Sequence, residues 1–326
     1  MAGIRDVAKR ARVSTSTVSL VLNNSGYVSE DTRKKVMEAV KELHYIPNEL
    51  ARNLFRSKTN MIGVILPDIY HPFFGSFAKY VEIELYAYGY KMMLCSTAQR
   101  KNGEKEYIDM LNRQMMDGII MGTHSLDVEE YKGVARPIIS LDRYINEEIP
   151  IVMSDHEAGG RLAAEELLKG GCKKVLQLMG SREVDTPAHW HHLSFEKVMQ
   201  KEDVVVYTEE MPWNQWDFKT FEDFIRSIID KYPDIDAVYG ADLSMVAFMK
   251  VAQEKGIQIP KDIQLVSYDG TDVTLMNTTT ITAVRQDIQK LAEKAVSLLI
   301  NKIKGQPIEK DRIVIGVTLV KGKSTL

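Results

Sequence analysis

The sequence of 326 residues contains few cysteines and no long apolar run. Its 2 cysteines, Cys95 and Cys172, are far apart, which argues against a disulfide framework or a cysteine-rich metal site and suits a reducing compartment. No stretch is apolar for long enough to span a bilayer, and residues 1–6 lack the apolar run of a signal peptide. We therefore expect a cytoplasmic protein that makes no contact with a membrane.

The motifs of common enzyme classes are also missing. The chain has no nucleophile elbow, no G-x-G-x-x-G after a predicted strand and no H-E-x-x-H. Residues 322–324 look like the end of a phosphate-binding loop, but Val317 stands where that loop needs a glycine, and no helix follows. We expect no catalytic residues, no cofactor and no enzymatic activity.

The first fifty residues carry a helix-turn-helix pattern. Apolar residues recur at helical spacing over residues 4–11, which predicts a first short helix. A turn follows, and Ser14 is placed to cap a second helix through its hydroxyl group. That helix turns Val18 and Val21 inward and leaves small polar side chains outside, which suits contact with base edges in a major groove. Ser29 is placed to begin a third helix.

The distribution of charge agrees with this pattern. Residues 1–60 hold 11 Lys and Arg against 6 Asp and Glu, whereas the whole chain has a net charge of −3. The remainder of the chain is therefore acidic. A basic end on an acidic body is typical of a protein that meets phosphate groups at one end.

From residue 61 onward, predicted strands and helices alternate. Residues 61–67 form a continuous apolar run, as in a strand that is buried on both faces of a parallel sheet. Regular alternation predicts an α/β fold with parallel sheets and right-handed crossovers, and the region is too long for one sheet. At its end we expect a long helix over residues 287–304 and one strand over residues 312–320.

Both regions resemble one known family. Residues 11–23 (A-x-V-S-x-x-T-V-S-x-V-L-N) and 45–54 (Y-x-P-N-x-x-A-R-x-L) are very similar to the headpiece and hinge of the LacI/GalR family of bacterial repressors. In the body, residues 63–74 (G-V-I-x-P-D-x-x-x-P-F-F), 141–143 (L-D-R) and 266–269 (V-S-Y-D) are also typical of the family. The resemblance covers nearly the whole chain.

This resemblance implies an α/β fold with an N-terminal helix-turn-helix headpiece, a hinge helix and two Rossmann-like lobes of the periplasmic-binding-protein type. The expected domains are the headpiece over residues 1–47, the hinge helix and linker over 48–59, and the body over 60–326. Within the body, the N-lobe is expected to take about residues 60–154 and 286–315, and the C-lobe about residues 155–285 and 316–326. The chain lacks the apolar heptad tail of a tetramer, so we expect a homodimer.

The resemblance also assigns residues to a double-stranded DNA operator of two-fold symmetry. Leu54 is expected to enter the minor groove at the operator centre, from a hinge helix that is too short to be stable alone. Leu20 stands where many relatives have arginine, and Arg12 stands where they have glycine. The expected DNA-binding residues are Arg12, Ser14, Thr15, Ser16, Thr17, Ser19, Leu20, Asn23, Tyr27, Asn48, Ala51, Arg52 and Leu54.

A small-molecule effector, most simply a carbohydrate, is expected between the lobes. Phe73 and Phe74 follow the first strand and either stack on a ligand or fill the core. Asp142 and Asp269 follow apolar strands at the carboxyl ends, where open α/β sheets bind ligands, and either accept from sugar hydroxyls or cap their loops. Trp216 lies in a polar loop, as a sugar platform or a core residue. The expected ligand-binding residues are Phe73, Phe74, Asp142, His191, Trp216 and Asp269.

Residues 185–195 contain three histidines within four positions. No matching cysteine or second histidine pair follows at the spacing of a zinc site, so we expect no metal. In the family, this helix presents an arginine that grips ligand oxygens, three residues before a Gly–aromatic pair. Here the pair is Ser194-Phe195 and His191 replaces the arginine, while Ala241 stands where many relatives place a ligand-binding asparagine. These departures leave the effector and its sugar class open.

These observations predict a sequence-specific transcriptional repressor that is controlled by a ligand between its lobes. A regulator whose body responds to a protein partner or to a non-sugar metabolite remains as an alternative. A binding protein for transport shares the expected body fold but has no use for the headpiece.

Overall fold

The computed structural model describes residues 2–46, 58–97, 103–123, 128–131, 133–182, 185–211, 217–308 and 310–326. The chain forms two compact units, Met1–Thr59 and Asn60–Leu326, and each is described by itself. The hinge helix is expected within residues 48–59, and residues 47–57 are not described. It therefore lies outside the described residues, together with Asn48, Ala51, Arg52, Leu54 and Trp216.

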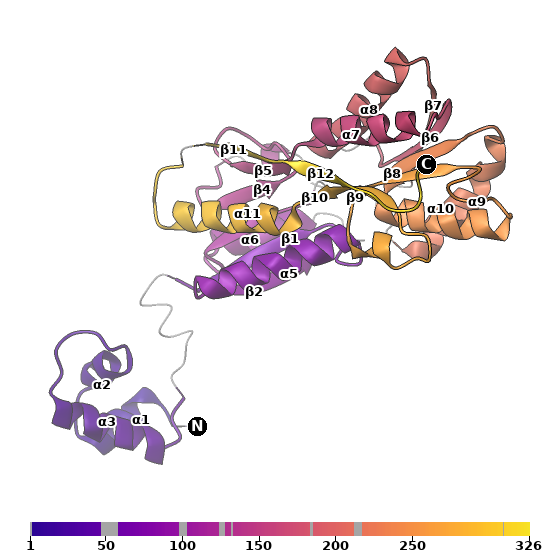
Figure 1. Cartoon of the computed structure of the whole chain (residues 1–326). Helices are drawn as coiled ribbons and strands as arrows, with labels where there is room; N and C mark the ends of the chain where they lie inside the picture. Colours follow the sequence, from indigo (N-terminus) through magenta and orange to yellow (C-terminus); the bar gives the residue numbers. More distant parts are fainter. Residues whose placement is uncertain are drawn as a thin grey trace. The chain divides into compact units, whose positions relative to one another are not determined.

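The first unit is a small helical domain (Figure 1). Its helices in the described residues are α1 (Ile4–Ala11), α2 (Thr15–Leu22) and α3 (Glu30–Glu42). Their apolar sides meet in a core around the fully buried side chains of Val7, Val18 and Val36. The helical spacing of these apolar residues accounts for the arrangement, because each helix turns one stripe inward.

The ends of these helices follow the predicted capping. Ser14 Oγ accepts a hydrogen bond from the backbone N–H of Thr17 at 3.0 Å, and Ser29 Oγ accepts one from Thr32 at 3.4 Å. Both predicted N-caps are therefore confirmed. Arg12 ends α1 in the left-handed conformation, with φ 55° and ψ 44°, which is unfavourable for a residue that carries a Cβ.

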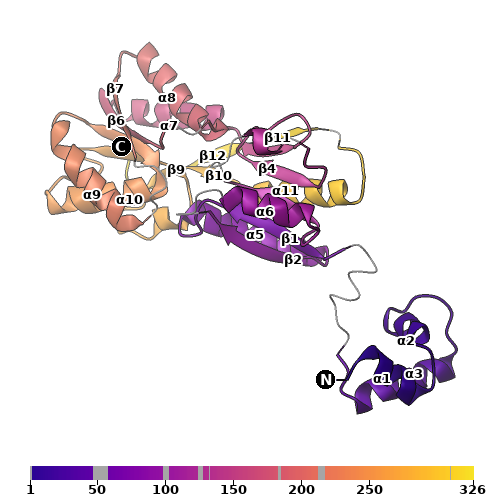
Figure 2. The same ribbon diagram turned by 180° about the vertical axis from the view of Figure 1, so that it is seen from behind.

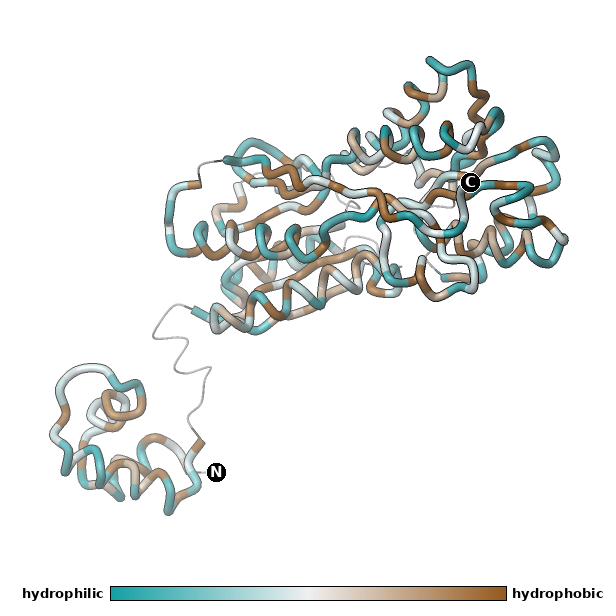
Figure 3. The backbone as a smooth tube through the Cα atoms, viewed as in Figure 1, coloured by the Kyte–Doolittle hydropathy of each residue, from teal (hydrophilic) through white to brown (hydrophobic). Residues whose placement is uncertain are grey.

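The second unit contains two sheets. The strands of the first are β1 (Met61–Leu66), β2 (Lys91–Ser96), β3 (Gly118–Met121), β4 (Ile138–Leu141), β5 (Ile151–Ser154) and β11 (Arg312–Ile315). They lie in the order β11-β5-β4-β3-β1-β2 and pair in parallel throughout. Most are apolar along their length, as the brown segments in Figure 3 show, because helices cover both faces of the sheet.

The strands of the second sheet are β6 (Lys174–Met179), β7 (Val205–Glu210), β8 (Ala237–Ala241), β9 (Gln264–Asp269), β10 (Thr282–Gln286) and β12 (Val317–Val320). Their order is β12-β10-β9-β8-β6-β7. All pairs are parallel except that of β12 with β10, which is antiparallel. We call the first sheet with its helices the first lobe and the second sheet with its helices the second lobe.

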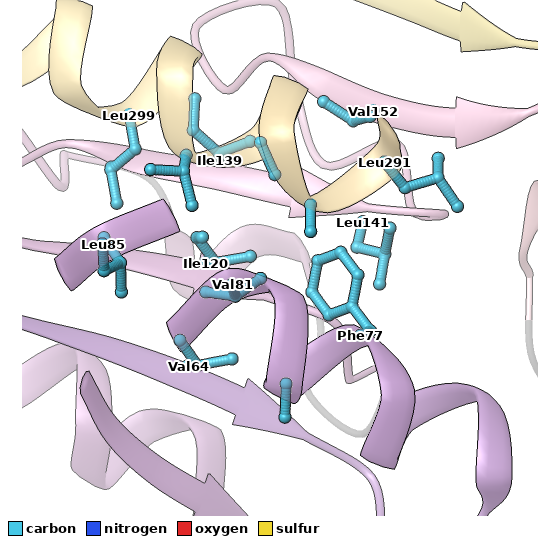
Figure 4. Close-up of a cluster of buried hydrophobic side chains, with 14 of the residues drawn as sticks. Val64, Phe77, Val81, Leu85, Ile120, Ile139, Leu141, Val152, Leu291 and Leu299 are labelled. Atoms are coloured by element: carbon cyan, nitrogen blue, oxygen red, sulfur yellow. The ribbon is translucent and has the colours of Figure 1, made fainter. Parts of the chain in front are cut away.

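Helices cover both faces of each sheet. In the first lobe they are α5 (Pro72–Ala87), α6 (Gly103–Asn112) and α11 (Ile288–Ile303). Figure 4 shows Phe77 and Val81 of α5 and Leu291 of α11 packed against sheet residues such as Ile120, and Figure 2 shows α6 on the opposite face.

The second lobe is built in the same way. Its helices are α7 (His156–Lys169), α8 (Trp190–Lys201), α9 (Phe218–Ile228) and α10 (Asp242–Glu254). Helices α7 and α8 share one core, and α9 and α10 share another. Short 3₁₀ helices lie at Val128–Tyr131, Pro187–His189, Ile229–Lys231 and Asp272–Leu275. None of the helices in the described part of the chain is both long and apolar enough to cross a membrane.

The end of the chain corrects one prediction. Residues 312–320 form two strands in different sheets, β11 and β12, with Gly316 between them, rather than the single strand expected. The β-branched residues on both sides of Gly316 give no sign of this change of sheet, and only the glycine marks the bend. The strand β10 was not assigned from the sequence either. The chain passes between the lobes at three places, after β5, after β10 and at Gly316.

Candidate functional site

A cavity of about 250 Å³ lies between the lobes of the second unit. Residues at the carboxyl ends of strands line it from both sides, including Asp142 after β4 and Asp269 at the end of β9. Open α/β sheets bind ligands at this edge, where loops rather than helices meet the strands. The two lobes therefore enclose one site, and movement between them would open or close it.

The cavity brings together five of the residues expected from the sequence. Phe73, Phe74, Asp142, His191 and Asp269 all line it, and so does Ala241. The rings of Phe73 and Phe74 meet edge to face, with centroids 5.3 Å apart and an angle of 82°. Phe73 is also part of the core of the first lobe, so it both lines the cavity and packs in the core.

Asp142 joins the first lobe to the second. Its Oδ1 lies 2.8 Å from Nε2 of His156, the first residue of α7, and its carbonyl oxygen accepts a hydrogen bond from Thr186 Oγ1 at 2.7 Å. Its φ of 50° is in the left-handed region, which a residue with a Cβ adopts rarely. The strained backbone thus places one residue in contact with two segments of the opposite lobe.

His156 continues this chain of contacts. Its Nδ1 lies 2.7 Å from the hydroxyl of Tyr268. The carboxylate of Asp142 only accepts, so His156 Nε2 carries the hydrogen on that side. Burial holds the pKa of Tyr268 well above its usual value, so this phenol keeps its proton and donates to Nδ1. In this series of hydrogen bonds, Tyr268 therefore donates to His156, and His156 donates to Asp142.

His191, on α8, is buried among aromatic side chains. Its ring stacks on that of Tyr268, and its Nδ1 lies 2.6 Å from the hydroxyl of Tyr239. Burial, with smaller contributions from nearby histidines such as His192, lowers the pKa of His191 well below its usual value. The lowered pKa favours a neutral His191 ring, unlike the arginine that this residue replaces. Since Tyr239 donates to Nδ1, the neutral ring carries its hydrogen on Nε2.

Close packing of two helices fixes this position. A Cβ on Gly160 of α7 would lie 2.0 Å from the carbonyl oxygen of His191 and 2.1 Å from Ser194 Oγ on α8. Only glycine allows α7 and α8 to approach so closely. Gly160 therefore fixes the distance between α7 and α8 and, with it, the position of His191 in the cavity wall.

Asp269 supplies a second carboxyl group from the opposite lobe. Its Oδ1 accepts from Gln286 Nε2 at 2.7 Å, and Gln286 Oε1 accepts from Ser154 Oγ at 2.6 Å, where two of the interlobe crossings meet. Burial, followed by the nearby charge of Asp242, raises the pKa of Asp269 well above its usual value. The carboxyl group is thus linked to the crossings as well as to the cavity.

Asp242 lies behind Asp269 and supports its loop. The Asp242 carboxylate accepts hydrogen bonds from the backbone N–H groups of Gly270, at 3.2 Å, and Thr271, at 2.7 Å, and from the hydroxyl of Ser267. Burial raises the pKa of Asp242 to about 6. This residue does not line the cavity, and it acts on the site by holding the chain that carries Asp269.

Sequence reasoning missed several residues of the site. His156, Thr186, Tyr268 and Gln286 all line the cavity or join the lobes there. Tyr268 and Gln286 belong to segments that carry the family resemblance, and this signal could have found them. Among the described residues, no group of three or more His, Cys, Asp or Glu is placed to hold a metal ion.

The first unit presents the other candidate surface. On α2, Thr15, Ser16 and Leu20 are exposed, and Arg12 and Ser14 are exposed just before it. Thr17, Ser19 and Asn23 are half-buried; Thr17 pairs with Ser14, and Asn23 donates to Ser19 Oγ at 3.1 Å. Tyr27 is 96% exposed in the loop before α3. Most of the expected DNA-binding residues in the described part of the headpiece are therefore accessible, and a few are half-buried and hydrogen-bonded to neighbouring side chains.

A helix-turn-helix unit followed by a two-lobed α/β body with a cavity between the lobes defines a DNA-binding regulator with a ligand-binding body. Comparison with known families agrees. The model described as "Bacterial regulatory proteins, lacI family" matches residues 3–48, and the model "Periplasmic binding proteins and sugar binding domain of LacI family" matches residues 59–323. The chain belongs to the lacI family of bacterial regulatory proteins.

Individual relatives cover the whole chain. It is 36% identical over 326 residues to the ribose operon repressor of Halalkalibacterium halodurans. This alignment covers 100% of this chain and 97% of that protein. It is 35% identical over 324 residues to the sucrose operon repressor of Streptococcus mutans, covering 99% of each.

Solved structures share the fold. The lac repressor dimer bound to operator and the anti-inducer ONPF matches with a TM-score of 0.87 at 24% identity, over 100% of this chain and 99% of that one. A periplasmic binding protein/LacI transcriptional regulator from Alkaliphilus metalliredigens, complexed with D-xylulofuranose, matches with a TM-score of 0.76 at 26% identity, over 82% and 99%.

Proposed function

We propose that this protein is a transcriptional repressor that binds a DNA operator of two-fold symmetry and is controlled by a sugar between its lobes. The observation that carries the proposal is the cavity of about 250 Å³, to which both lobes contribute hydrogen-bonding groups. Family membership supports the role of the headpiece. The protein acts by binding rather than by catalysis, and it works in the cytoplasm, where its DNA is.

The choice of a sugar rests on the relatives and on the cavity. The similar repressors named above belong to ribose and sucrose operons, and one similar structure holds D-xylulofuranose. In this chain, Asp142 and Asp269 offer acceptors for hydroxyl groups, and Phe73 and Phe74 offer apolar rings. A sugar presents both kinds of surface, since its ring carries hydroxyl groups at the edge and C–H groups on the face.

Control by the ligand works through the contacts between lobes. Asp142 holds His156 and Thr186 across the cavity, so a ligand that strengthens or displaces these contacts changes the angle between the lobes. The domain limits we propose are residues 1–47 for the headpiece, 48–59 for the hinge and 60–326 for the body. A change of lobe angle in the body is passed on to the DNA-binding part through the hinge.

A homodimer fits the operator symmetry. The body exposes apolar side chains on both lobes, among them Ile83 and Tyr86 on α5, Leu94 on β2, and Leu275 and Met276. Exposed apolar groups of this kind are typical of protein interfaces. A second copy related by a two-fold axis would bury the same side chains on both partners and place two headpieces on two half-sites.

The proposal is tested with the full-length protein and its selected operator. Sites selected from random DNA should show two-fold symmetry, and their affinity should change when D-ribose, D-fructose, D-xylulose or sucrose is added. Fluorescence anisotropy of the labelled operator gives the affinity. If no sugar alters it while a purine base does, the regulator responds to a non-sugar metabolite and the sugar proposal is wrong.

A further inference from the structure

The polar groups around the cavity carry an unusual balance of charge. Among the described residues that line it, none is lysine or arginine, whereas both lobes contribute a carboxyl group, Asp142 and Asp269. A bound phosphate or carboxylate needs cations or several backbone N–H groups to offset its charge. The lining therefore offers acceptors for hydroxyl groups and little that compensates an anion.

Both carboxyl groups are held in place by unfavourable backbone geometry. The φ of Asp142 is 50° and that of Asp269 is 101°, conformations that residues with a Cβ adopt rarely. Such residues tend to cluster at ligand sites, because the surrounding structure must hold them there. Two strained aspartates from opposite lobes thus face one cavity, which is hard to explain if they only cap loops.

The surroundings of the cavity favour the neutral form of both imidazole and carboxyl groups. Burial lowers the pKa of the His191 and His192 imidazoles, so that both are uncharged near neutral pH. Burial also raises the pKa of Asp269, which opposes the formation of a negative charge there. An environment that disfavours charge on its own side chains also disfavours charge on a ligand.

The hydrogen-bonding capacity that remains matches hydroxyl groups. A carboxylate accepts up to about four hydrogen bonds, so the one from Gln286 leaves Asp269 free to accept more. The neutral ring of His191 has an N–H at Nε2, and the buried Nδ1 of His192 has no hydrogen-bond partner within the described structure. Hydroxyl groups can both donate and accept, so they suit this mixture of acceptors and donors.

We propose that the effector is an uncharged polyhydroxylated molecule of monosaccharide size, and that the cavity rejects its phosphorylated and carboxylated counterparts. This inference rests on the proposed function, because it concerns the ligand of the same cavity. It adds the charge of the ligand, which decides whether the protein responds to a free sugar or to its phosphorylated product.

Matched pairs of compounds test the inference on the full-length protein. Isothermal titration calorimetry is carried out with D-ribose and D-ribose 5-phosphate, D-fructose and D-fructose 6-phosphate, and D-xylulose and D-xylulose 5-phosphate. We expect one neutral sugar to bind and its phosphate to bind at least about 100-fold more weakly, because an uncompensated anion near a carboxylate is strongly disfavoured.

A variant separates the charge of the site from its shape. Asp142→Asn removes one carboxyl group and should narrow the ratio between the affinities for neutral sugar and phosphate by at least about tenfold. Burial already opposes a negative charge on Asp269, so Asp269→Asn should change this ratio less. Asp272→Asn is the matched control, because Asp272 is exposed three residues further on and does not line the cavity. Circular dichroism and thermal unfolding show whether each variant is folded.

Each outcome has a separate meaning. Binding of a neutral sugar with rejection of its phosphate, and a smaller ratio between the two affinities in Asp142→Asn, supports the inference. Binding of a phosphorylated sugar as tightly as its neutral counterpart overturns it but leaves a sugar-controlled repressor in place. If neither member of any pair binds or alters operator affinity while a purine base does, the proposed function fails and the inference fails with it.

Discussion

The ring of His191 lies flat on the ring of Tyr268, with centroids 3.7 Å apart and an angle of 9° between their planes. Tyr268 in turn contacts His156, which binds Asp142 of the first lobe. The stack therefore connects the residue that replaces the usual arginine of the family to the contact between lobes. A neutral histidine fits this stack, whereas a charged one would have to be buried without a carboxylate partner.

His191→Arg should weaken sugar binding at least about tenfold, because the guanidinium must be buried in the aromatic stack or must disrupt it. His191→Gln keeps a neutral donor and should bind more tightly than the arginine variant. Since the His191 pKa is well below its usual value, the unmodified protein and His191→Gln should show the same pH dependence of affinity above about pH 7. Calorimetry of both proteins at several pH values measures this, and a fall in affinity from pH 7 to 8.5 that is absent from His191→Gln would assign a positive charge to His191.

His71 makes the stability of the body depend on pH. Burial lowers the His71 pKa from 6.5 to about 4, so below pH 6.5 the unfolded chain binds a proton that the folded chain does not. This contribution to stability is present above pH 6.5 and is lost as the pH falls toward 4, by about 2 kcal/mol between pH 7.5 and pH 5.

His71→Asn should remove that part of the pH dependence. Urea unfolding of the full chain at the two pH values measures the free energy of unfolding of both proteins. The difference between the variant and the unmodified protein is compared, because the raised pKa values of Asp242 and Asp269 make stability change with pH in the opposite direction. His44→Asn is the control, since His44 is exposed in the headpiece. Equal pH dependence with and without His71 would show that its ring is not buried in solution.

Arg12→Gly should stabilise the headpiece by about 1 kcal/mol, because glycine adopts the left-handed conformation at this position without strain. The same variant should bind all DNA sequences more weakly and show a smaller salt dependence if the arginine contacts a phosphate. Thermal unfolding and anisotropy titrations at several salt concentrations measure both effects. Altered base preference at an unchanged salt slope would instead assign Arg12 to base recognition.

Tyr86→Glu should weaken the dimer, because the side chain is 79% exposed on α5 and a charge there would be buried against a second copy. Leu193→Glu is a matched control on α8, where an apolar side chain is 58% exposed outside the proposed interface. Sedimentation equilibrium distinguishes monomer from dimer. A dimer that tolerates Tyr86→Glu but not Leu193→Glu would instead place the interface at α8.

The sequence predicted the alternation of strands and helices well, because long buried strands and amphipathic helices have distinct apolar periods. The pattern of apolar residues did not predict how strands are shared between sheets, although the lobe limits implied by the family resemblance change between residues 315 and 316. Residues 312–320 read as one strand, yet β11 and β12 belong to different lobes, since the partner of each strand is decided by chain segments far away in the sequence.

The candidate site was predicted in its positions but not in its charges. Strand ends and the family resemblance pointed to Asp142, Asp269 and His191, and these residues do meet in one cavity. The protonation of His191 depends on burial and on stacking with Tyr268, which sequence spacing does not reveal. His156 was missed for a similar reason, because its partners Asp142 and Tyr268 come from both lobes.

The central claim is that the ligand of the cavity and the operator influence each other through the body and the hinge. The most direct test measures operator affinity with and without saturating neutral sugar, and sugar affinity with and without saturating operator, on the same full-length protein. Linkage requires both affinities to change by the same factor, which we expect to be roughly 5–150-fold. A sugar that binds to the protein in calorimetry while leaving operator affinity unchanged would contradict the account.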